Sequence, residues 1–354
     1  MFFRPPPVSS RRGYVAVLGT TVAVAGGALI GLPLKGTPGL TLLGVAVLGT
    51  GMPHGAVDHL VARRLFGWND TRGTVLFYAG YLALAALYGI GWWLWPTGAL
   101  ALFLLMAAYH FGQADLAYLT TQRARGRAVL YLSRGLLVVG SPLLARPGAV
   151  APVVDALAGI TPPPAGPAWW PAASVAALAA QHALVLGAYT RGSDRGRREW
   201  FTVPALALLF GAAPPLAAFA VYFGLWHALG HIFVLMRFFR AARERAGGES
   251  LSETPRTVRA LYRRAALFTL LPLGGLGAVL AARPIRTPEA LAALFVLISV
   301  LTLPHMLLVE RLYRHERRCQ HRHERRCQAG TPEEGSSSRS SAGFTANDGG
   351  SLEG

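Results

Sequence analysis

Residues 222–236 read YFGLWHALGHIFVLM, an apolar stretch without a formal charge that carries two histidines four residues apart. On a helix, positions i and i+4 lie on one face, so His227 and His231 point toward the same neighbours. Imidazoles in an apolar run cost free energy unless something binds them, and an ionisable residue in a membrane helix indicates a functional site. The pair alone is equally consistent with two unrelated polar groups hydrogen-bonded to neighbouring helices. Metal binding therefore depends on further histidines at the same depth.

The composition assigns the chain to the integral membrane proteins. Of 354 residues, 53% are hydrophobic and 14% charged, and the mean hydropathy is +0.39, whereas a soluble domain carries about 25% charged residues. The net charge of +17 comes almost entirely from arginine, since Lys35 is the sole lysine. These arginines form short clusters between apolar segments and no continuous basic face, so we interpret them as topology signals and expect no nucleic-acid binding.

The apolar segments predict an all-α, polytopic integral-membrane helical bundle of about eight to ten transmembrane helices, since one crossing needs about 20 residues. The seventh segment is short and ends at Ala213-Pro214-Pro215, so it is either a half-crossing or part of the eighth. A further apolar stretch, Ala149 to Ile160, is too short to cross and is expected to form an interfacial cap. The predicted spans are 14–33, 39–60, 74–95, 99–120, 128–145, 169–190, 200–213, 215–237, 265–282 and 288–311.

Three regions follow from this map: a cytosolic N-terminal leader at 1–13, a transmembrane catalytic bundle at 14–312, and a cytosolic tail at 313–354. The tail repeats the sequence RHERRCQ at 314–320 and 322–328 and then becomes rich in Ser and Gly, so we expect it to be mostly disordered. Both cysteines, Cys319 and Cys327, lie in the tail, which excludes a disulfide in the bundle.

Arginine placement predicts the orientation of the chain in the membrane. Loops after even-numbered spans are arginine-rich, whereas loops after odd-numbered spans hold little beyond Lys35, Arg146, Arg283 and Arg286. By the positive-inside rule, both termini are cytoplasmic, and the protein is expected in the cell (inner) membrane as a multi-pass protein.

Five histidines share one depth in this map. His54, His110, the pair His227 and His231, and His305 occupy spans two, four, eight and ten, which all run from outside to inside. Neutral imidazoles suit iron, copper or zinc, whereas magnesium and calcium prefer oxygen ligands. The sequence therefore predicts a shared metal site in which His54, His110, His227 and His231 give a four-nitrogen set, with His305 as a fifth ligand or as a group that supports the ligands.

An acidic residue follows three of the histidines at a short offset. Asp58 is four residues after His54, Asp115 five after His110 and Glu310 five after His305. Metal-bound histidine usually donates its other N–H to a carboxylate or carbonyl, so each carboxylate is a candidate to orient a ligand. For Asp115 and Glu310, pairing with arginines is an equally good interpretation.

Aromatic residues surround the histidines, among them Tyr222, Phe223 and Trp226. Such residues are most often plain core. Beside a metal, they would also suit a long apolar or polyene substrate, and we assign these three to the lining of the substrate site.

At these motifs the sequence resembles the Brp/Blh (bacteriorhodopsin-related-protein-like) family of integral-membrane β-carotene 15,15′-dioxygenases. The motifs are Pro53-His54-Gly55 with Asp58, Tyr109-His110-Phe111-Gly112, Trp226-His227-Ala-Leu-Gly230-His231 and, less closely, Pro304-His305. The resemblance implies cleavage of the central double bond of β-carotene, or of a related carotenoid, by O₂ in the lipid bilayer. It also implies a non-haem Fe(2+) cofactor held by His54, His110, His227 and His231, and two all-trans-retinal molecules as product.

Two other functions are consistent with a buried histidine cluster. A zinc-dependent intramembrane lipid hydrolase, resembling alkaline ceramidases, would use three histidines to hold zinc and Asp58 as an acid or base. A non-enzymatic haem- or proton-carrying membrane protein would use the histidines as axial ligands or relay groups.

Overall fold

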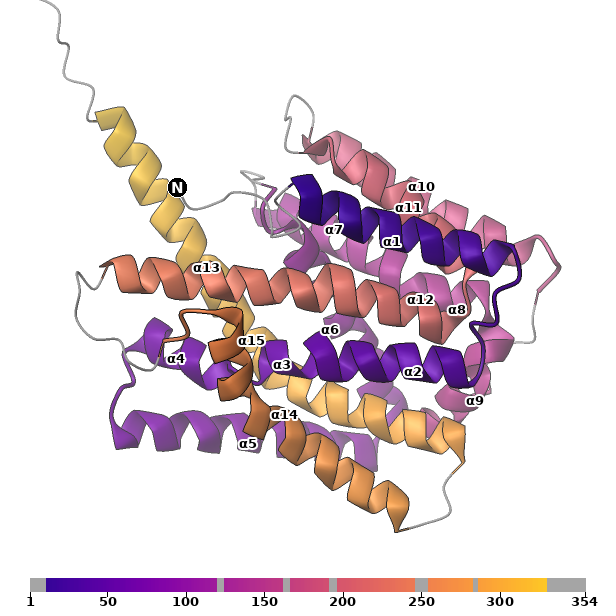
Figure 1. Ribbon diagram of the computed structural model, residues 1–354, viewed down its shortest axis with the longest axis horizontal. Coiled ribbons are helices and arrows are strands. Elements are labelled where there is room, and N and C mark those ends of the chain that lie inside the picture. The colour runs from indigo at the N-terminus through magenta and orange to yellow at the C-terminus, as the bar shows by residue number, and fades with distance from the viewer. Residues whose placement is uncertain are drawn as a thin grey trace, which may run out of the picture.

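The computed structural model describes residues 11–119, 124–161, 166–190, 196–245, 254–282 and 286–329, and every regular element in these ranges is a helix (Figure 1). The all-α prediction is therefore confirmed. The helices lie mainly along the long axis of the molecule. They are α1 (Arg11–Leu29), α2 (Thr37–Ala46), η1 (Val47–Gly51), α3 (Met52–Gly55), α4 (Asp58–Phe66), α5 (Thr71–Leu94), α6 (Pro96–Leu116), α7 (Ala124–Gly135), η2 (Leu136–Gly140), α8 (Ser141–Ala145), α9 (Pro147–Ala158), α10 (Trp170–Thr190), α11 (Glu199–Ala212), α12 (Pro215–Val221), η4 (Tyr222–Ala228), α13 (Leu229–Arg245), α14 (Val258–Ala281) and α15 (Thr287–Ala329).

Within the described residues, nine helical segments are long and apolar enough to cross a membrane. This agrees with the predicted eight to ten, and the chain is a multi-pass membrane protein. The predicted seventh span corresponds to α11, an apolar helix of 14 residues that is shorter than these nine, and the interfacial cap predicted at 149–160 overlaps the short apolar helix α9. The nine are Arg11–Leu29, Thr37–Phe66, Thr71–Leu94, Pro96–Leu116, Gly126–Ala145, Trp170–Thr190, Pro215–Glu244, Val258–Ala281 and Thr287–Cys319.

Local sequence signals set where several helices begin and end. The Asp70 carboxylate accepts a hydrogen bond from the Gly73 amide at the start of α5, and the Thr257 hydroxyl does the same for Ala260 at the start of α14. Proline stands in the first turn of α6, α9 and α12, where its missing N–H costs nothing. Gly67 ends α4 with φ 70°, a left-handed conformation that glycine adopts without strain.

Two π-helical segments cross near the middle of the bundle. η1 follows α2 and η4 follows α12, and the Thr50 hydroxyl of η1 donates to the Gly224 carbonyl of η4 at 3.0 Å. The crossing is close because both helices have glycine there: a methyl group on Gly51 would collide with the Phe223 ring, and one on Gly224 would stand 3.0 Å from Cβ of Ala46. Single turns of π-helix are frequent at functional sites, because they rotate the side chains that follow.

Helices α6 and α7 also approach to backbone contact. A methyl group on Gly112 would overlap the Tyr131 carbonyl, and one on Gly135 would overlap the Ala108 carbonyl. Small residues allow such contacts between membrane helices, where dispersion forces rather than water expulsion hold helices together.

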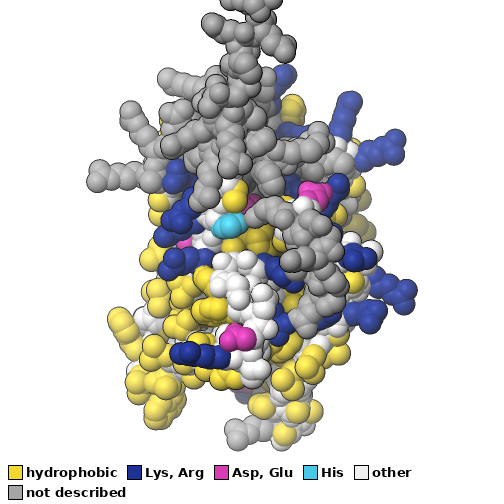
Figure 2. Space-filling model, turned by 90° about the vertical axis from the view of Figure 1, so that its left-hand side faces the viewer, with side chains coloured by type: hydrophobic (Ala, Val, Ile, Leu, Met, Phe, Trp, Pro, Cys, Tyr) yellow, Lys and Arg dark blue, Asp and Glu magenta, His cyan; other side chains and the backbone are white. Residues whose placement is uncertain are grey.

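One end of the bundle is rich in arginine, and Figure 2 shows these side chains around that end. α15 continues there as a helix to Ala329, so residues 313–329 are helical where we expected disorder to begin; residues 330–354 lie outside the described residues. The exposed arginines include Arg240 in α13, Arg259 and Arg263 in α14 and Arg314 in α15.

Candidate metal centre

Five helical segments bring five histidines together inside the bundle. His54 comes from α3, His110 from α6, His227 from η4, His231 from α13 and His305 from α15. All are buried, and the most exposed of them, His54, has 6% of its surface accessible. The predicted convergence of histidines from separate crossings is therefore present in the structure.

The imidazole rings contact their neighbours edge to face. The His54 ring centroid lies 5.3 Å from that of His227, 5.5 Å from that of His231 and 5.1 Å from that of His305. The His110 centroid lies 5.0 Å from that of His227 and 5.2 Å from that of His305. Among the described residues, His54, His110 and His227 each offer a ring nitrogen within 4.8 Å of the others, a spacing at which three nitrogens can hold one metal ion.

Hydrogen bonds at two of the histidines leave the opposite ring nitrogen available. Nδ1 of His54 lies 3.3 Å from the Thr50 carbonyl, and as a donor it would leave Nε2 with its lone pair. Nδ1 of His305 lies 3.0 and 2.9 Å from the two Asp58 carboxylate oxygens, and its Nε2 is buried without a hydrogen-bond partner. A carboxylate behind a histidine fixes the tautomer and increases ligand basicity, as in many metal sites.

Asp58 thus supports a histidine other than the one suggested by the offset of four residues. His54 lies in α3 and Asp58 begins α4, and the break between these helices turns the carboxylate toward α15. Tyr81 of α5 is a further member of this group: its hydroxyl lies 3.3 Å from Asp58 Oδ2 and 3.2 Å from the Leu301 carbonyl. Sequence reasoning missed Tyr81, because only the packing of α5 against α15 brings it there.

His231 lies one helical turn beyond His227. Its ring centroid is 5.5 Å from that of His54 and 5.6 Å from that of His305, and both of its nitrogens are buried without a hydrogen-bond partner. An unpaired buried imidazole costs free energy, which a bound ion would recover.

The other two carboxylates that follow histidines are bound elsewhere. Asp115 contacts Arg134 and Tyr222, and Glu310 accepts from Gln113 and from Arg314. For both residues the arginine interpretation is therefore the correct one.

An apolar cavity of about 790 Å³ opens onto the cluster. Four of the five histidines line it, namely His54, His110, His227 and His305. Its walls include Phe103 and Leu104 of α6, Val153 and Leu157 of α9, Phe219 of α12, Phe268 of α14 and Phe295 of α15.

Of the three aromatic residues assigned to the substrate site, the cavity-lining residues include Phe223 but neither Tyr222 nor Trp226. The Trp226 indole donates to Thr21 Oγ1 of α1 at 2.9 Å, and the Tyr222 hydroxyl lies 3.1 Å from Asp115. Successive side chains on a helix point in different directions, so Trp226 faces α1 although it is next to His227 in sequence. Phe111, which we did not assign, has its ring 4.6 Å from that of His227.

The cluster geometry also bears on the alternative functions. The ring centroids of contacting imidazoles lie 5.0 to 5.6 Å apart, so the histidines form one cluster and are not two isolated axial ligands. Asp58 lies within hydrogen-bond distance of His305 and Tyr81, so in this structure it supports a histidine of the cluster.

Comparison with known proteins identifies the family of this chain. Residues 45–313 match the profile of a family described as Beta-carotene 15,15′-dioxygenase. The chain is 31% identical over 308 residues to a protein of Halobacterium salinarum named Probable beta-carotene 15,15′-dioxygenase Blh, covering 80% of this chain and 86% of that protein. It is 24% identical over 268 residues to Beta-carotene 15,15′-dioxygenase of an uncultured marine bacterium, 66A03, covering 75% of this chain and 90% of the relative. No solved structure matches. With the family profile covering most of the chain, this protein belongs to the β-carotene 15,15′-dioxygenase family.

Proposed function

We propose that the protein cleaves the central 15,15′ double bond of β-carotene with O₂ and yields two molecules of all-trans-retinal. The observation that carries the proposal is a buried histidine cluster that opens onto a large apolar cavity. Family membership supports the same reaction. The reaction balances without a further reductant, because the carbon–carbon double bond is broken and each oxygen atom of O₂ ends in one aldehyde.

The residues present fit a non-haem Fe(2+) ion. His54, His110, His227 and His231 would hold it as neutral nitrogen ligands, and His305 would add a fifth nitrogen through Nε2. The support is the 4.8 Å spacing of three nitrogens and the unpartnered nitrogens of His231 and His305. When bound, iron(II) with such ligands supplies a position at which O₂ binds and becomes reactive.

The chain itself supplies a dry and shaped site. The apolar walls would take up a polyene from the bilayer and exclude water, which limits side reactions of oxygen. Phe223 lines the cavity and stacks on His227 with ring centroids 5.8 Å apart and an interplanar angle of 16°. In this position, Phe223 would pack against the central part of a bound polyene and hold it beside the histidines.

The arginine-rich end would face the cytoplasm, with both termini on that side and the protein in the cell membrane. The support is the arginine surface in Figure 2 together with the loop pattern in the sequence. The chain would consist of a leader at 1–13, a catalytic bundle at 14–312 and a tail from 313 whose first residues are helical.

Expression in a β-carotene-producing bacterium tests the function. We expect loss of the orange colour and accumulation of all-trans-retinal, and loss of both effects when His54, His110, His227 or His231 is replaced by alanine. His182→Asn is the matched control, because His182 is buried but bonds Ser133 outside the cluster. Colour retained with the unmodified, membrane-inserted protein would refute the proposal, whereas zinc in place of iron in the purified protein would favour the hydrolase.

A further inference from the structure

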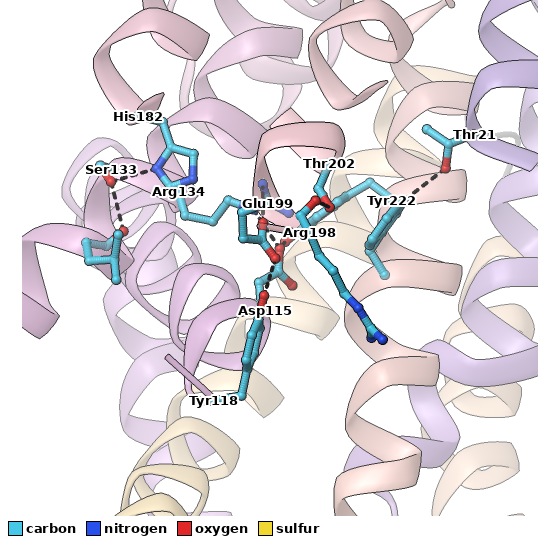
Figure 3. A network of polar contacts seen from close by, with 12 residues as sticks. Thr21, Asp115, Tyr118, Ser133, Arg134, His182, Arg198, Glu199, Thr202 and Tyr222 are labelled. Atoms are coloured by element: carbon cyan, nitrogen blue, oxygen red, sulfur yellow. Dashed lines mark hydrogen bonds and ion pairs between the residues drawn. The ribbon is translucent and has the colours of Figure 1, made fainter. Parts of the chain in front are cut away.

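A buried ion cluster lies next to the histidines and is drawn in Figure 3. Its centre is Arg134 of α7, whose side chain has 1% of its surface accessible. Nε of Arg134 donates to Oδ2 of Asp115 at 2.9 Å, and its Nη1 lies 3.6 Å from Oε2 of Glu199. One guanidinium thus pairs with two carboxylates from α6 and α11.

Each carboxylate also accepts a hydrogen bond from one tyrosine. The Tyr222 hydroxyl donates to Asp115 Oδ2 at 3.1 Å, and the Tyr118 hydroxyl donates to Glu199 Oε1 at 2.6 Å. The two tyrosines are chemically alike and both are buried. They differ in what they connect: Tyr118 lies just beyond α6 and joins it to α11, whereas Tyr222 joins α6 to η4.

The contact between Tyr222 and Asp115 connects two segments of the histidine cluster. Asp115 lies five residues after His110 on α6, and Tyr222 is the first residue of η4, which carries His227 five residues later. The Phe111 ring contacts both Tyr222 and His227, with its centroid 5.6 Å from the Tyr222 ring and 4.6 Å from the His227 ring.

The π-helical segment explains why an external contact is useful. A π-turn is a rare conformation that neighbouring structure must hold in place, and its exact winding sets the direction of His227. A hydrogen bond from the first residue of η4 to a carboxylate anchored by arginine fixes this winding relative to α6. The anchor is strong because charged groups buried in a membrane protein are costly to separate.

We propose that Arg134, Asp115 and Tyr222 are positioning residues that hold His110 and His227 at metal-binding distance and thereby set the metal affinity of the site. The inference rests on the metal site of the proposed function but not on the identity of the substrate. Tyr118 and Glu199 belong to the same ion cluster, yet they connect to no histidine of the site.

Metal binding by the metal-free protein, purified in detergent, tests this inference without any turnover assay. We would titrate Co²⁺ into Tyr222→Phe and Tyr118→Phe and follow its visible absorption, which reports the ligand geometry. We expect Tyr222→Phe to weaken Co²⁺ binding about tenfold, as loss of a group that orients a ligand typically does, and to alter the spectrum. Tyr118→Phe should bind Co²⁺ like the unmodified protein, although both variants lose one buried hydroxyl contact and should melt at similar temperatures.

A double substitution separates positioning from general destabilisation. If Tyr222 acts through Asp115, the variant carrying both Tyr222→Phe and Asp115→Asn should lose no more affinity than the weaker-binding single variant. Equal losses for Tyr118→Phe and Tyr222→Phe, or an unchanged affinity in Tyr222→Phe, would overturn the inference. If His110→Ala does not reduce Co²⁺ binding, the metal site on which the inference rests is wrong. If the protein binds Co²⁺ as expected but forms no retinal, only the proposed substrate is wrong and the positioning role stands.

Discussion

At the scale of single residues, the contacts made in space, and not the spacing in the sequence, decide which imidazole a carboxylate supports. Asp58 and Glu310 both follow a cluster histidine closely in sequence, but Asp58 contacts His305 and Glu310 contacts Gln113 and Arg314. The Asp58 contact is almost completely buried, and a charge-assisted hydrogen bond gains strength where water is excluded.

We predict that Asp58→Asn lowers the iron affinity of the purified protein by about 10- to 100-fold. The variant lacks the carboxylate that orients His305 and increases its basicity. Glu310→Gln is the matched control, since its carboxylate touches no cluster histidine among the described contacts. Competition with a chelator of known affinity measures the effect. Equal affinities for the two variants would contradict the role of Asp58.

The orientation of aromatic side chains gives a second prediction at this scale. Phe223→Ala should reduce retinal formation about tenfold or more, because the substrate loses a cavity wall beside His227. Trp226→Phe should leave the turnover rate unchanged and cost about 0.5–1.5 kcal/mol of stability through the lost bond to Thr21, while the phenyl ring keeps an aromatic group beside Tyr14. Retinal yield normalised to membrane-inserted protein is the measurement, and a larger loss in Trp226→Phe would refute this assignment.

At the scale of helices, glycines near the histidines fall into different classes that sequence alone does not separate. Gly112 permits backbone contact between α6 and α7, Gly55 would place a methyl group 3.5 Å from His305, and Gly230 faces open space. Only the first is therefore required by close helix packing.

Gly112→Ala should destabilise the protein by about 1–3 kcal/mol, because the added methyl group overlaps the Tyr131 backbone and forces the two helices apart. Gly230→Ala is the control. It adds the same methyl group to a helix without any collision and should be neutral or stabilising by up to about 1 kcal/mol. Thermal unfolding in detergent compares them, and an equal loss of stability in both would show that packing at Gly112 is not the cause.

At the scale of the whole molecule, the distribution of arginine distinguishes the two ends of the bundle. The arginines gather at the end where α4 and α13 finish and α14 begins (Figures 1 and 2). A basic segment crosses a membrane with difficulty during insertion, so this end should remain in the cytoplasm.

Cysteine labelling measures this orientation. In a background with Cys319→Ser and Cys327→Ser, Thr161→Cys should react with a membrane-impermeant maleimide in intact spheroplasts, whereas Asn69→Cys should react only after permeabilisation. Both positions are exposed and lie at opposite ends of predicted spans. The reverse pattern would place both termini outside and refute the predicted topology.

Sequence patterns were sufficient for the parts of this protein that depend on local properties. Composition and apolar segment length identify a membrane bundle, because they reflect the solvent in which each helix must be stable. Helix direction and residue depth then bring the five histidines to one level, and the structure shows them in contact.

Tertiary structure alone decided what each of these side chains touches. The pairing of Asp58 with His305, the participation of Tyr81, the rotation of Trp226 toward α1 and the contact of Tyr222 with Asp115 all depend on which helices are neighbours and how each is turned about its axis. Hydropathy is nearly uniform around most of these helices, so it carries little information about that rotation. The rotation is set by close contacts such as those at Gly51 and Gly112 and by π-turns, whose physical cause lies in the partner helix rather than in the local sequence.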